Sequence, residues 1–246
     1  MFIIKKLLKS NIATFYFYKK VKATKKFFSG TSLSNLFPLR RLFLIMKVKP
    51  YTLLSYKRLS FLYEAAIYLN TEKINGDFVE CGSWNGGSGG IIASLAGKRK
   101  TWLFDSWEGM PNAGEHDIKL KKKNIFGERG MAISSFEKAS NLLFGRLRLD
   151  PNNVLLVRGW FEETVLSVVS KINQISLLHL DCDWYESVKF CLENFYTKVI
   201  SGGYVVIDDY GSWAGCRKAV DEFIREKELG VRLIKIDKDA VYFVKQ

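Results

Sequence analysis

The sequence predicts an α/β fold in which helices cover both faces of a mostly parallel, seven-stranded sheet. From about residue 74 onward, short β-branched runs alternate with longer helical stretches, which is typical of a parallel sheet with crossover helices. Most of the short runs are continuously apolar, as expected for strands covered on both faces. The last two runs are separated by the turn-prone Asp237-Lys238-Asp239, so we expect at least one late strand to be antiparallel.

The expected elements alternate along the chain. Strands are expected at residues 77–81, 101–105, 153–157, 175–180, 203–207, 231–236 and 240–244. Helices are expected at residues 56–69, 88–96, 134–144, 161–169, 185–196 and 216–226. The charged segment 111–130 follows the carboxyl end of the second strand, where we expect a lid or a substrate loop.

Basic residues are concentrated at the N-terminus. Residues 1–63 contain fourteen Lys and Arg and no Asp or Glu, whereas the other 183 residues contain 24 basic and 25 acidic side chains. The net charge of +13 therefore belongs to one end of the chain. We divide the sequence into a basic, amphipathic and helical N-terminal extension (residues 1–49) and one α/β domain (residues 50–246).

Residues 1–30 mix Lys clusters with Phe, Tyr, Ile and Leu. This composition suits contact with an anionic membrane surface. A solvated arm, or a helix packed on a partner subunit, fits the same composition. No apolar run approaches the ~18 residues of a membrane span, and Lys interrupts each apolar stretch before the ~7-residue core of a secretory signal. We therefore expect a cytoplasmic protein that is peripheral at the inner membrane surface if this arm binds lipid.

The strongest local motif is VECGSWNGGSGG at residues 79–90. Glycine permits a sharp turn from strand to helix, and the start of the helix offers unpaired N–H groups to a ligand. The motif reads E-x-G-x-x-x-G, unlike the GxGxxG of dinucleotide folds. Methyltransferases place the methionine part of S-adenosylmethionine at such a turn, with an acid, here Glu80, facing its ammonium group. For the motif alone, an ordinary glycine-rich turn is the alternative.

The second strand also ends in an acid. Asp105 follows Glu80 by about 25 residues, and an acid at this point accepts hydrogen bonds from the hydroxyls of an adenosine ribose. NAD-binding folds use the same device, so Asp105 indicates a nucleoside without choosing the cofactor. Trp107 fits either the adenine pocket or a core or lid position.

Two further strands end in carboxylates, with Asp181 and Asp183 after the fourth and Asp208 and Asp209 after the fifth. The carboxyl ends of neighbouring parallel strands meet in one crevice. Carboxylates in one crevice repel each other, and a hard cation such as Mg²⁺ relieves the repulsion. We therefore predict Asp181, Asp208 and Asp209 as metal ligands. Asp183 also fits a cap of the following helix.

A metal ion at this place would activate a substrate hydroxyl for methyl transfer. A substrate hydroxyl bound to Mg²⁺ becomes more acidic and is held in line with a sulfonium methyl group. Asp181 is the predicted catalytic base. His179 and His116 are the alternative bases, although His179 also fits an ordinary buried histidine in the middle of a strand.

The chain resembles the macrocin-type O-methyltransferases, which modify sugar hydroxyls on macrolides. The motifs that carry the resemblance are PYTLLSYKRL (50–59), GDFVECGSWNGGSG (76–89), FDSWEGMP (104–111), VRGWFEETV (157–165), LHLDCDWYES (178–187), SGGYVVIDDYGSWAGCRKAVDEF (201–223) and the ending IDKDAVYFVK. Where the family often reads D-G-D, this chain has Asp181-Cys182-Asp183, which keeps both acids.

The resemblance implies a class I methyltransferase domain with a Rossmann-like fold, S-adenosylmethionine as cofactor, Mg²⁺ on the three acids, and a homo-oligomer. The expected cofactor-binding residues, including Trp107 and Asp181 from the patterns above, are Thr52, Leu53, Glu80, Cys81, Gly82, Ser83, Trp84, Asn85, Asp105, Ser106, Trp107, Gly159, Trp160 and Asp181.

The acceptor is expected to be a hydroxylated sugar or glycan. The segment 111–130 matches the family poorly and is rich in Lys (Lys119, Lys121, Lys122 and Lys123). A nucleotide-linked sugar, a lipid-linked glycan or a polysaccharide end suits such a loop better than a macrolide, and a natural-product glycoside is a further candidate.

Two other classes of function fit parts of the sequence. A NAD(P)-dependent oxidoreductase shares the strand pattern, but the missing GxGxxG and the acidic crevice argue against it. A nucleic-acid-binding protein is suggested by the pI of about 9.5. Its charge, however, lies on a terminal arm and no nucleic-acid-binding motif is present, so no nucleic acid partner is expected.

Overall fold

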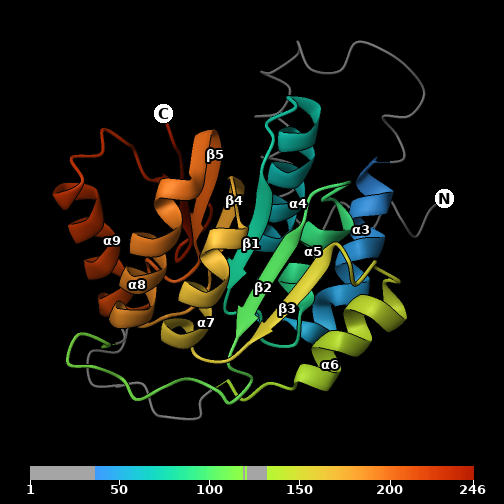
Figure 1. The fold of residues 1–246 in the computed structure, drawn as a ribbon, viewed down its shortest axis with the longest axis horizontal. Helices are drawn as coiled ribbons and strands as arrows, with labels where there is room; N and C mark the ends of the chain where they lie inside the picture. The colour runs from blue at the N-terminus through green and yellow to red at the C-terminus, as the bar shows by residue number, and fades with distance from the viewer. Residues whose placement is uncertain (1–36, 119, 121–131) are drawn as a thin grey trace. The chain divides into compact units, whose positions relative to one another are not determined.

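The computed structural model describes residues 37–118, 120 and 132–246, and Phe43–Gln246 form a compact unit. Seven strands of this unit make one sheet in the order β3-β2-β1-β4-β5-β7-β6 (Figure 1). The strands are β1 (Asp77–Cys81), β2 (Thr101–Asp105), β3 (Val154–Arg158), β4 (Ile175–Leu180), β5 (Val199–Ile207), β6 (Ile234–Lys235) and β7 (Val241–Val244).

Strands β1 to β5 are parallel, whereas β7 is antiparallel to β5 and β6 is antiparallel to β7. The predicted antiparallel late strand is therefore confirmed. The strand order reverses between β1 and β4, which are direct neighbours. In an open α/β sheet, the crevice beyond the carboxyl ends of the strands at such a reversal is where a ligand binds.

Helices connect the strands and cover the sheet. They are α3 (Phe37–Val48), α4 (Tyr56–Thr71), α5 (Gly87–Ser94), α6 (Phe136–Ser140), α7 (Phe161–Val168), α8 (Tyr185–Phe195) and α9 (Ala214–Glu226), with short turns at Lys49–Tyr51, Asn141–Arg146, Val169–Lys171 and Tyr196–Lys198. Among the described residues, no helix is both long and apolar enough to cross a bilayer.

Two apolar cores lie on opposite faces of the sheet because successive side chains of a strand point in opposite directions. Phe78 of β1 and Leu103 of β2 belong to the core that includes α4 and α5. Their neighbours Val79 and Phe104 belong to the core that includes α7, α8 and α9. The continuously apolar strands that the sequence showed are thus explained by burial on both faces.

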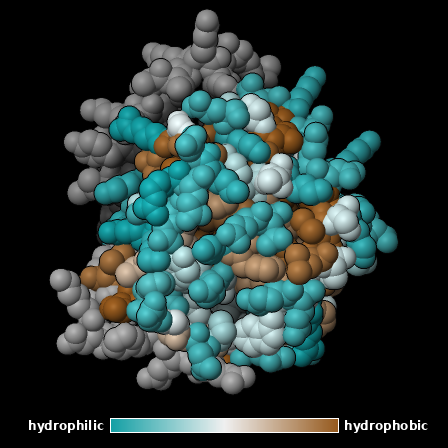
Figure 2. All heavy atoms as spheres, turned by 60° about the vertical axis from the view of Figure 1, so that its left-hand side comes forward, coloured by the Kyte–Doolittle hydropathy of each residue, from teal (hydrophilic) through white to brown (hydrophobic). Residues whose placement is uncertain are grey.

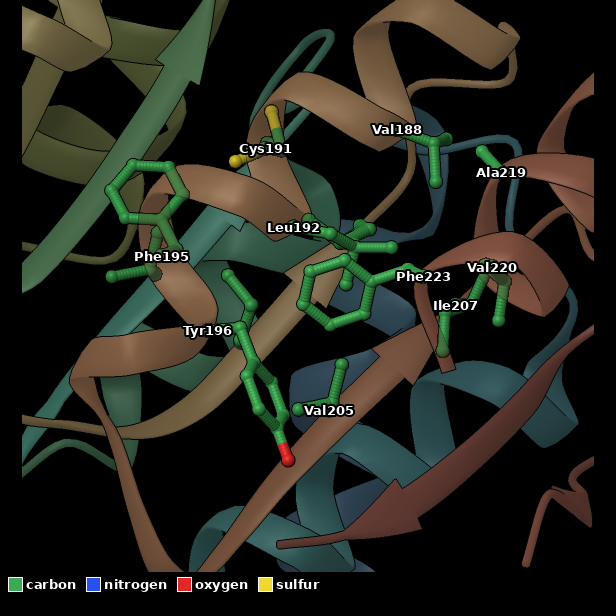
Figure 3. Close-up of a cluster of buried hydrophobic side chains, with 14 of the residues drawn as sticks. Val188, Cys191, Leu192, Phe195, Tyr196, Val205, Ile207, Ala219, Val220 and Phe223 are labelled. Atoms are coloured by element: carbon green, nitrogen blue, oxygen red, sulfur yellow. The ribbon is translucent and has the colours of Figure 1, made fainter. Parts of the chain in front are cut away.

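The second core includes buried side chains of α8, β5 and α9. Figure 3 shows Leu192 and Phe195 of α8, Val205 of β5 and Phe223 of α9 as members of one cluster, and all four side chains are buried. Each contributes about 1.5–3 kcal/mol to folding through burial. Strands β4 and β5 pair in parallel beneath these helices, which brings the acids that follow each strand side by side.

Helix α9 is amphipathic. Its buried residues are Gly215, Cys216, Ala219, Val220 and Phe223, which recur at the spacing of one helical face. Beside this face Lys218 pairs with Glu222 at 2.9 Å. Figure 2 shows the side of the molecule that carries α9, where hydrophilic residues surround smaller apolar areas.

Most expected elements are present within two residues of their predicted ends, with three exceptions. The expected strand 231–236 is reduced to Ile234–Lys235, because only these residues pair with β7. The expected helix 134–144 is α6 followed by a wider π-helical turn at Asn141–Arg146. Strand β5 begins four residues earlier than expected, at Val199, where it already pairs with Ile175.

Helix α3 lies within the predicted helical extension. Ile45 and Val48 in its second half are buried in the core that includes α4 and α5. The basic segment 1–30, for which membrane contact was one prediction, lies outside the described residues.

Candidate functional site

A pocket of about 350 Å³ opens at the carboxyl ends of the parallel strands. Twelve of the predicted site residues line it: Thr52, Leu53, Gly82, Ser83, Trp84, Asp105, Ser106, Gly159, Trp160, Asp181, Asp208 and Asp209. They come from the segment before α4 and from the ends of β1 to β5. The sheet thus brings together residues that are far apart in the sequence.

The floor of the pocket depends on Gly82. This residue follows β1 with φ of 92°, a left-handed conformation that favours glycine. A Cβ atom at Gly82 would overlap the backbone carbonyl oxygen of Asp181, which follows β4. The first glycine of the motif is therefore required both by its backbone angle and by the close approach of β4.

Asp105 holds the turn after β1 against the end of β2. One carboxylate oxygen accepts the backbone N–H of Trp84 at 2.7 Å, and the other accepts that of Trp107 at 2.7 Å. Burial raises the pKa of Asp105 above its ordinary value, and these two hydrogen bonds oppose the rise. Each oxygen keeps a lone pair for a further donor, so Asp105 is able to accept ribose hydroxyls.

Four predicted cofactor residues, Glu80, Cys81, Asn85 and Trp107, do not line the pocket. Trp107 is buried, its ring packs edge-on against Phe136 at 5.0 Å, and its indole N–H donates to the Trp84 carbonyl at 2.7 Å. Of the two roles that the sequence left open for Trp107, the structure supports the core position. Trp107 supports the pocket from behind by fixing Trp84.

The other three also act from behind the pocket. Asn85 accepts the backbone N–H of Ser135 at 3.1 Å and so fastens the segment before α6 to the glycine turn. Cys81 is fully buried in the core that includes α8. Glu80 is fully buried, with one oxygen 2.9 Å from Nδ1 of His179. Among the described residues, its other oxygen has no hydrogen-bond partner.

The predicted metal ligands lie together. One carboxylate oxygen from each of Asp181, Asp208 and Asp209 lies within 4.8 Å of the other two. Burial, and then the charges of neighbouring acids, raise the pKa of Asp181 and Asp209 well above the ordinary value. One oxygen of Asp209 is buried and has no hydrogen-bond partner among the described residues. Three converging oxygens with an unsatisfied acceptor fit a hard divalent cation.

His179 lies behind this cluster. Its Nδ1 faces Glu80, and its Nε2 lies 4.0 Å from a carboxylate oxygen of Asp208. Complete burial favours the neutral ring, but hydrogen bonding and charge from Asp208 and Glu80 outweigh it and raise the pKa of His179 to about 9. His179 does not line the pocket, so it is a buried partner of two acids, as one of its predicted alternatives held.

Asp183 lines the pocket and is not part of the three-oxygen cluster. Its φ of 54° is unusual for a residue other than glycine. Burial, and then the charge of Asp208, raise its pKa to about 6. The predicted alternative, a cap of α8, is not what the structure shows. The N–H of Tyr185 at the start of α8 is instead accepted by Asp117 at 2.8 Å.

His116 does not line the pocket either. Its ring packs edge-on against Tyr185 at 4.9 Å. The four Lys of the expected substrate loop have no described contacts, since Lys119, Lys121, Lys122 and Lys123 lie outside the described residues.

Arg58 also lines the pocket, although no pattern in the sequence predicted it as a site residue. Its guanidinium pairs with Asp208, with Asp237 at 2.9 Å and with Asp239 at 3.1 Å. Burial alone would lower the pKa of Arg58, but the surrounding carboxylates outweigh this effect and raise the pKa above its ordinary value. The signal in the sequence was only a basic residue within the motif PYTLLSYKRL, next to a second one, Lys57.

Comparisons with known proteins identify the family of this chain. The macrocin O-methyltransferase (TylF) family model matches residues 46–245. Demethyldecarbamoylnovobiocin O-methyltransferase of Streptomyces niveus is 32% identical over 198 residues, 78% of this chain and 75% of that protein. Mycinamicin III 3''-O-methyltransferase of Micromonospora griseorubida is 26% identical over 200 residues, 78% of each chain.

The solved structure of the O-methyltransferase NovP has a TM-score of 0.67 and 29% identity to this chain, and the match covers 80% of this chain and 82% of that one. These matches to O-methyltransferases argue against the alternative of a NAD(P)-dependent oxidoreductase. The chain therefore belongs to the macrocin O-methyltransferase family and is an S-adenosylmethionine-dependent O-methyltransferase with the class I fold.

Proposed function

We propose that this enzyme transfers the methyl group of S-adenosylmethionine to a hydroxyl of a sugar, on a natural-product glycoside or another glycan, and that it requires Mg²⁺. The observation that carries the proposal is the cluster of three carboxylates in the same pocket as Asp105. The names of the relatives support a sugar acceptor. One of them, from Streptomyces olivaceus and 28% identical, methylates the 4' oxygen of a rhamnosyl tetracenomycin.

Each wall of the pocket has its own task in this proposal. Asp105 accepts the ribose hydroxyls, and Gly82 and Ser83 leave space for the backbone to approach the methionine part. Thr52 and Leu53 close the pocket from the side of α4. Leu53 is 72% exposed, so it is available to contact a ligand at the rim of the pocket.

Asp181, Asp208 and Asp209 hold the cation. When bound, Mg²⁺ lowers the pKa of a coordinated hydroxyl and orients it. The task left to the protein is to accept the proton of the sugar hydroxyl and to hold that oxygen in line with the methyl group. A buried carboxylate with a raised pKa, such as Asp181, binds a proton more strongly than an ordinary carboxylate and is therefore suited to this task.

We assign the proton to a carboxylate oxygen of Asp181 that faces the pocket, as the sequence predicted. Asp183 is a second candidate base. It lines the pocket, its pKa is raised to about 6, and it is not one of the three clustered acids. A base that is free of the cation keeps more of its proton affinity. The variants Asp181→Asn and Asp183→Asn distinguish the two, because only loss of a cation ligand also weakens Mg²⁺ binding.

The acceptor side of the pocket is apolar and aromatic. Met110, Pro111, Trp160 and Phe161 are among the residues that line the pocket. Aromatic faces pack on the C–H faces of sugar rings, while the acids contact the hydroxyls.

We retain the expectations of a cytoplasmic homo-oligomer and of no nucleic acid partner as parts of this proposal.

The cofactor and cation sites are tested by calorimetric titration of S-adenosylhomocysteine, with and without Mg²⁺, into the wild type and two variants. Asp105→Ala should weaken binding by roughly 10–150-fold, because it removes hydrogen bonds to a charged group worth about 1.5–3 kcal/mol. Asp181→Ala should keep S-adenosylhomocysteine binding but lose Mg²⁺ binding. No binding of either ligand by the wild type would contradict the proposal.

The acceptor is tested separately by transfer of a labelled methyl group to a panel of rhamnosides, nucleotide-linked sugars and lipid-linked glycans, with and without EDTA. Transfer to a sugar hydroxyl that EDTA abolishes is expected. Transfer that EDTA does not change would refute the requirement for Mg²⁺ while leaving the sugar acceptor in place.

A further inference from the structure

Arg58 joins three parts of the chain at the edge of the proposed cation site. It lies in the first turn of α4, and its side chain is only 13% exposed. Its Nη1 contacts Asp208 after β5, whereas its Nε and Nη2 contact Asp237 and Asp239 in the turn between β6 and β7. A guanidinium with all three nitrogens on carboxylates is fixed in both position and orientation.

The turn that holds Arg58 is itself held in place. The second oxygen of Asp237 accepts the backbone N–H groups of Asp239 and Ala240, each at 2.9 Å. The carbonyl of Asp239 accepts the N–H of Gly211 at 2.6 Å, which ties the turn to the segment after β5. Burial alone would raise the pKa of Asp237, but the hydrogen bonds from Ala240, Arg58 and Asp239 outweigh it and lower the pKa to about 2, so Asp237 stays charged across the physiological range.

Arg58 is also tied to the cofactor side of the pocket. Ser55, the N-cap of α4, accepts the backbone N–H of Arg58 at 3.3 Å and donates to Asp237 at 3.3 Å. The segment immediately before it, with Thr52 and Leu53, lines the pocket. Arg58, which contacts Asp208, is thus only a few residues after the segment that we assign to cofactor binding.

We propose that Arg58 is a positioning residue that holds the carboxylate of Asp208 in the orientation in which it binds the cation, with the turn Asp237–Asp239 as its support. This inference rests on the proposed cation site. It assigns a task to the hairpin β6–β7, whose turn approaches the site without contributing a ligand to the three-acid cluster.

The direction in which cation affinity changes when Arg58 is removed distinguishes a positioning role from a purely electrostatic effect. Arg58 is a positive charge beside a cation site, and by Coulomb's law its removal should strengthen cation binding. If Arg58 positions Asp208, its removal should weaken binding instead, because Asp208 then rotates freely or turns away. Partners that orient metal ligands are typically worth 10–100-fold in metal affinity.

The test is calorimetric titration of Mg²⁺ into the 246-residue chain, repeated with Mn²⁺ by measuring the free ion with electron paramagnetic resonance. Arg58→Gln should weaken the affinity by about 10–100-fold. Arg58→Lys should restore little of it, because one ammonium group cannot contact three separated carboxylates. The matched control is Lys57→Gln, which removes the same charge from an exposed neighbour on α4 and should leave the affinity unchanged.

A second arm tests the support by the turn. Asp237→Asn alone should weaken Mg²⁺ binding, but this result alone would also follow from the loss of a negative charge. The same change in an Arg58→Gln background should then have no further effect, because the turn acts through Arg58. Additive losses would contradict the support by the turn. Thermal unfolding and S-adenosylhomocysteine affinity are recorded for each variant to show that the fold and the cofactor pocket are retained.

The outcomes for the two proposals differ. If the wild type binds Mg²⁺ and Asp209→Asn does not, the cation site stands. Unchanged or stronger binding by Arg58→Gln then overturns only the positioning role. If the wild type itself binds neither Mg²⁺ nor Mn²⁺, the cation site and the role of Arg58 both fail.

Discussion

His179 and Glu80 form a completely buried pair, with Nδ1 of the ring 2.9 Å from a carboxylate oxygen. The two residues are direct neighbours on the adjacent strands β4 and β1. On the other side of the ring, Nε2 lies 4.0 Å from Asp208, which follows β5. A line of charged groups therefore crosses three strands beneath the pocket, and a protonated His179 is favoured because acids lie on both sides of it.

This pair predicts a specific dependence of stability on pH in the protein without divalent cations. The pKa of His179 is raised to about 9, above the ordinary 6.5 that applies after unfolding. Its contribution to stability is therefore complete below about pH 6.5 and is lost as the pH rises through 9. We expect the free energy of unfolding, measured with urea in EDTA, to fall between pH 7 and pH 9.5.

The control for this prediction is His179→Gln, because the glutamine side chain does not bind a proton in this pH range. The variant should be less stable at pH 7, and its stability should change less between pH 7 and pH 9.5 than that of the wild type. Parallel curves for the two proteins would show that His179 is neutral in the fold.

Gly82 should be among the least tolerant positions of the domain. In Gly82→Ala the new methyl group would overlap the carbonyl oxygen of Asp181, and the φ of 92° adds strain. We expect a loss of more than about 4 kcal/mol, measured as reduced soluble yield and a lower unfolding midpoint.

Gly97→Ala is the matched control for Gly82→Ala. Gly97 also has a positive φ, of 66°, but a Cβ atom there would meet nothing closer than the side chain of Asn70 at 4.0 Å. Its cost should therefore be only the backbone strain of about 1–2 kcal/mol. Equal losses at the two positions would mean that β1 and β4 separate to accommodate the methyl group.

The positions of the acids could be predicted from the sequence because they follow from periodicity alone. Asp105, Asp181 and Asp208 each come directly after an apolar run, and parallel strands bring their carboxyl ends to one edge of the sheet. Asp105 and Asp181 are 76 positions apart in the sequence, yet no knowledge of side-chain packing was needed to place both in one pocket.

The partners of these acids could not be predicted in this way. Arg58 and Asp208 are 150 residues apart, and their contact depends on how α4 packs beside the hairpin β6–β7. The cap of α8 by Asp117 spans 68 residues and depends on the path of an irregular segment. The role of Trp107 depends on which of two apolar environments its ring enters, and residue type does not distinguish a pocket wall from a core.

Trp107 should affect cofactor binding without contacting the cofactor. Trp107→Phe removes the indole N–H that holds the Trp84 carbonyl at 2.7 Å. We expect a loss of about 1–3 kcal/mol in unfolding free energy and weaker binding of S-adenosylhomocysteine by calorimetry. Trp102→Phe is the matched control, because it removes a similar bond, to Asp77 at 2.9 Å, outside the pocket. Trp102→Phe should lower stability alone, and weaker binding in both variants would point to a general loss of structure.

The basic segment 1–30 is expected to affect where the protein is located and not its catalysis. It carries eight Lys and no acid, and each Lys near an anionic surface is worth about 1 kcal/mol of attraction. We expect the 246-residue chain to sediment with vesicles that contain phosphatidylserine and to be released by salt, and a chain without residues 1–30 to stay in the supernatant. Vesicles of phosphatidylcholine alone should retain neither protein, because the attraction depends on surface charge.

Deletion of residues 1–30 should leave S-adenosylhomocysteine affinity unchanged, since the pocket is built from residue 52 onward. Equal sedimentation of the two proteins would leave the solvated arm or the partner-subunit helix as the role of this segment. Light scattering then separates these two, because only an arm that packs on a partner subunit should change the mass of the particle when it is removed.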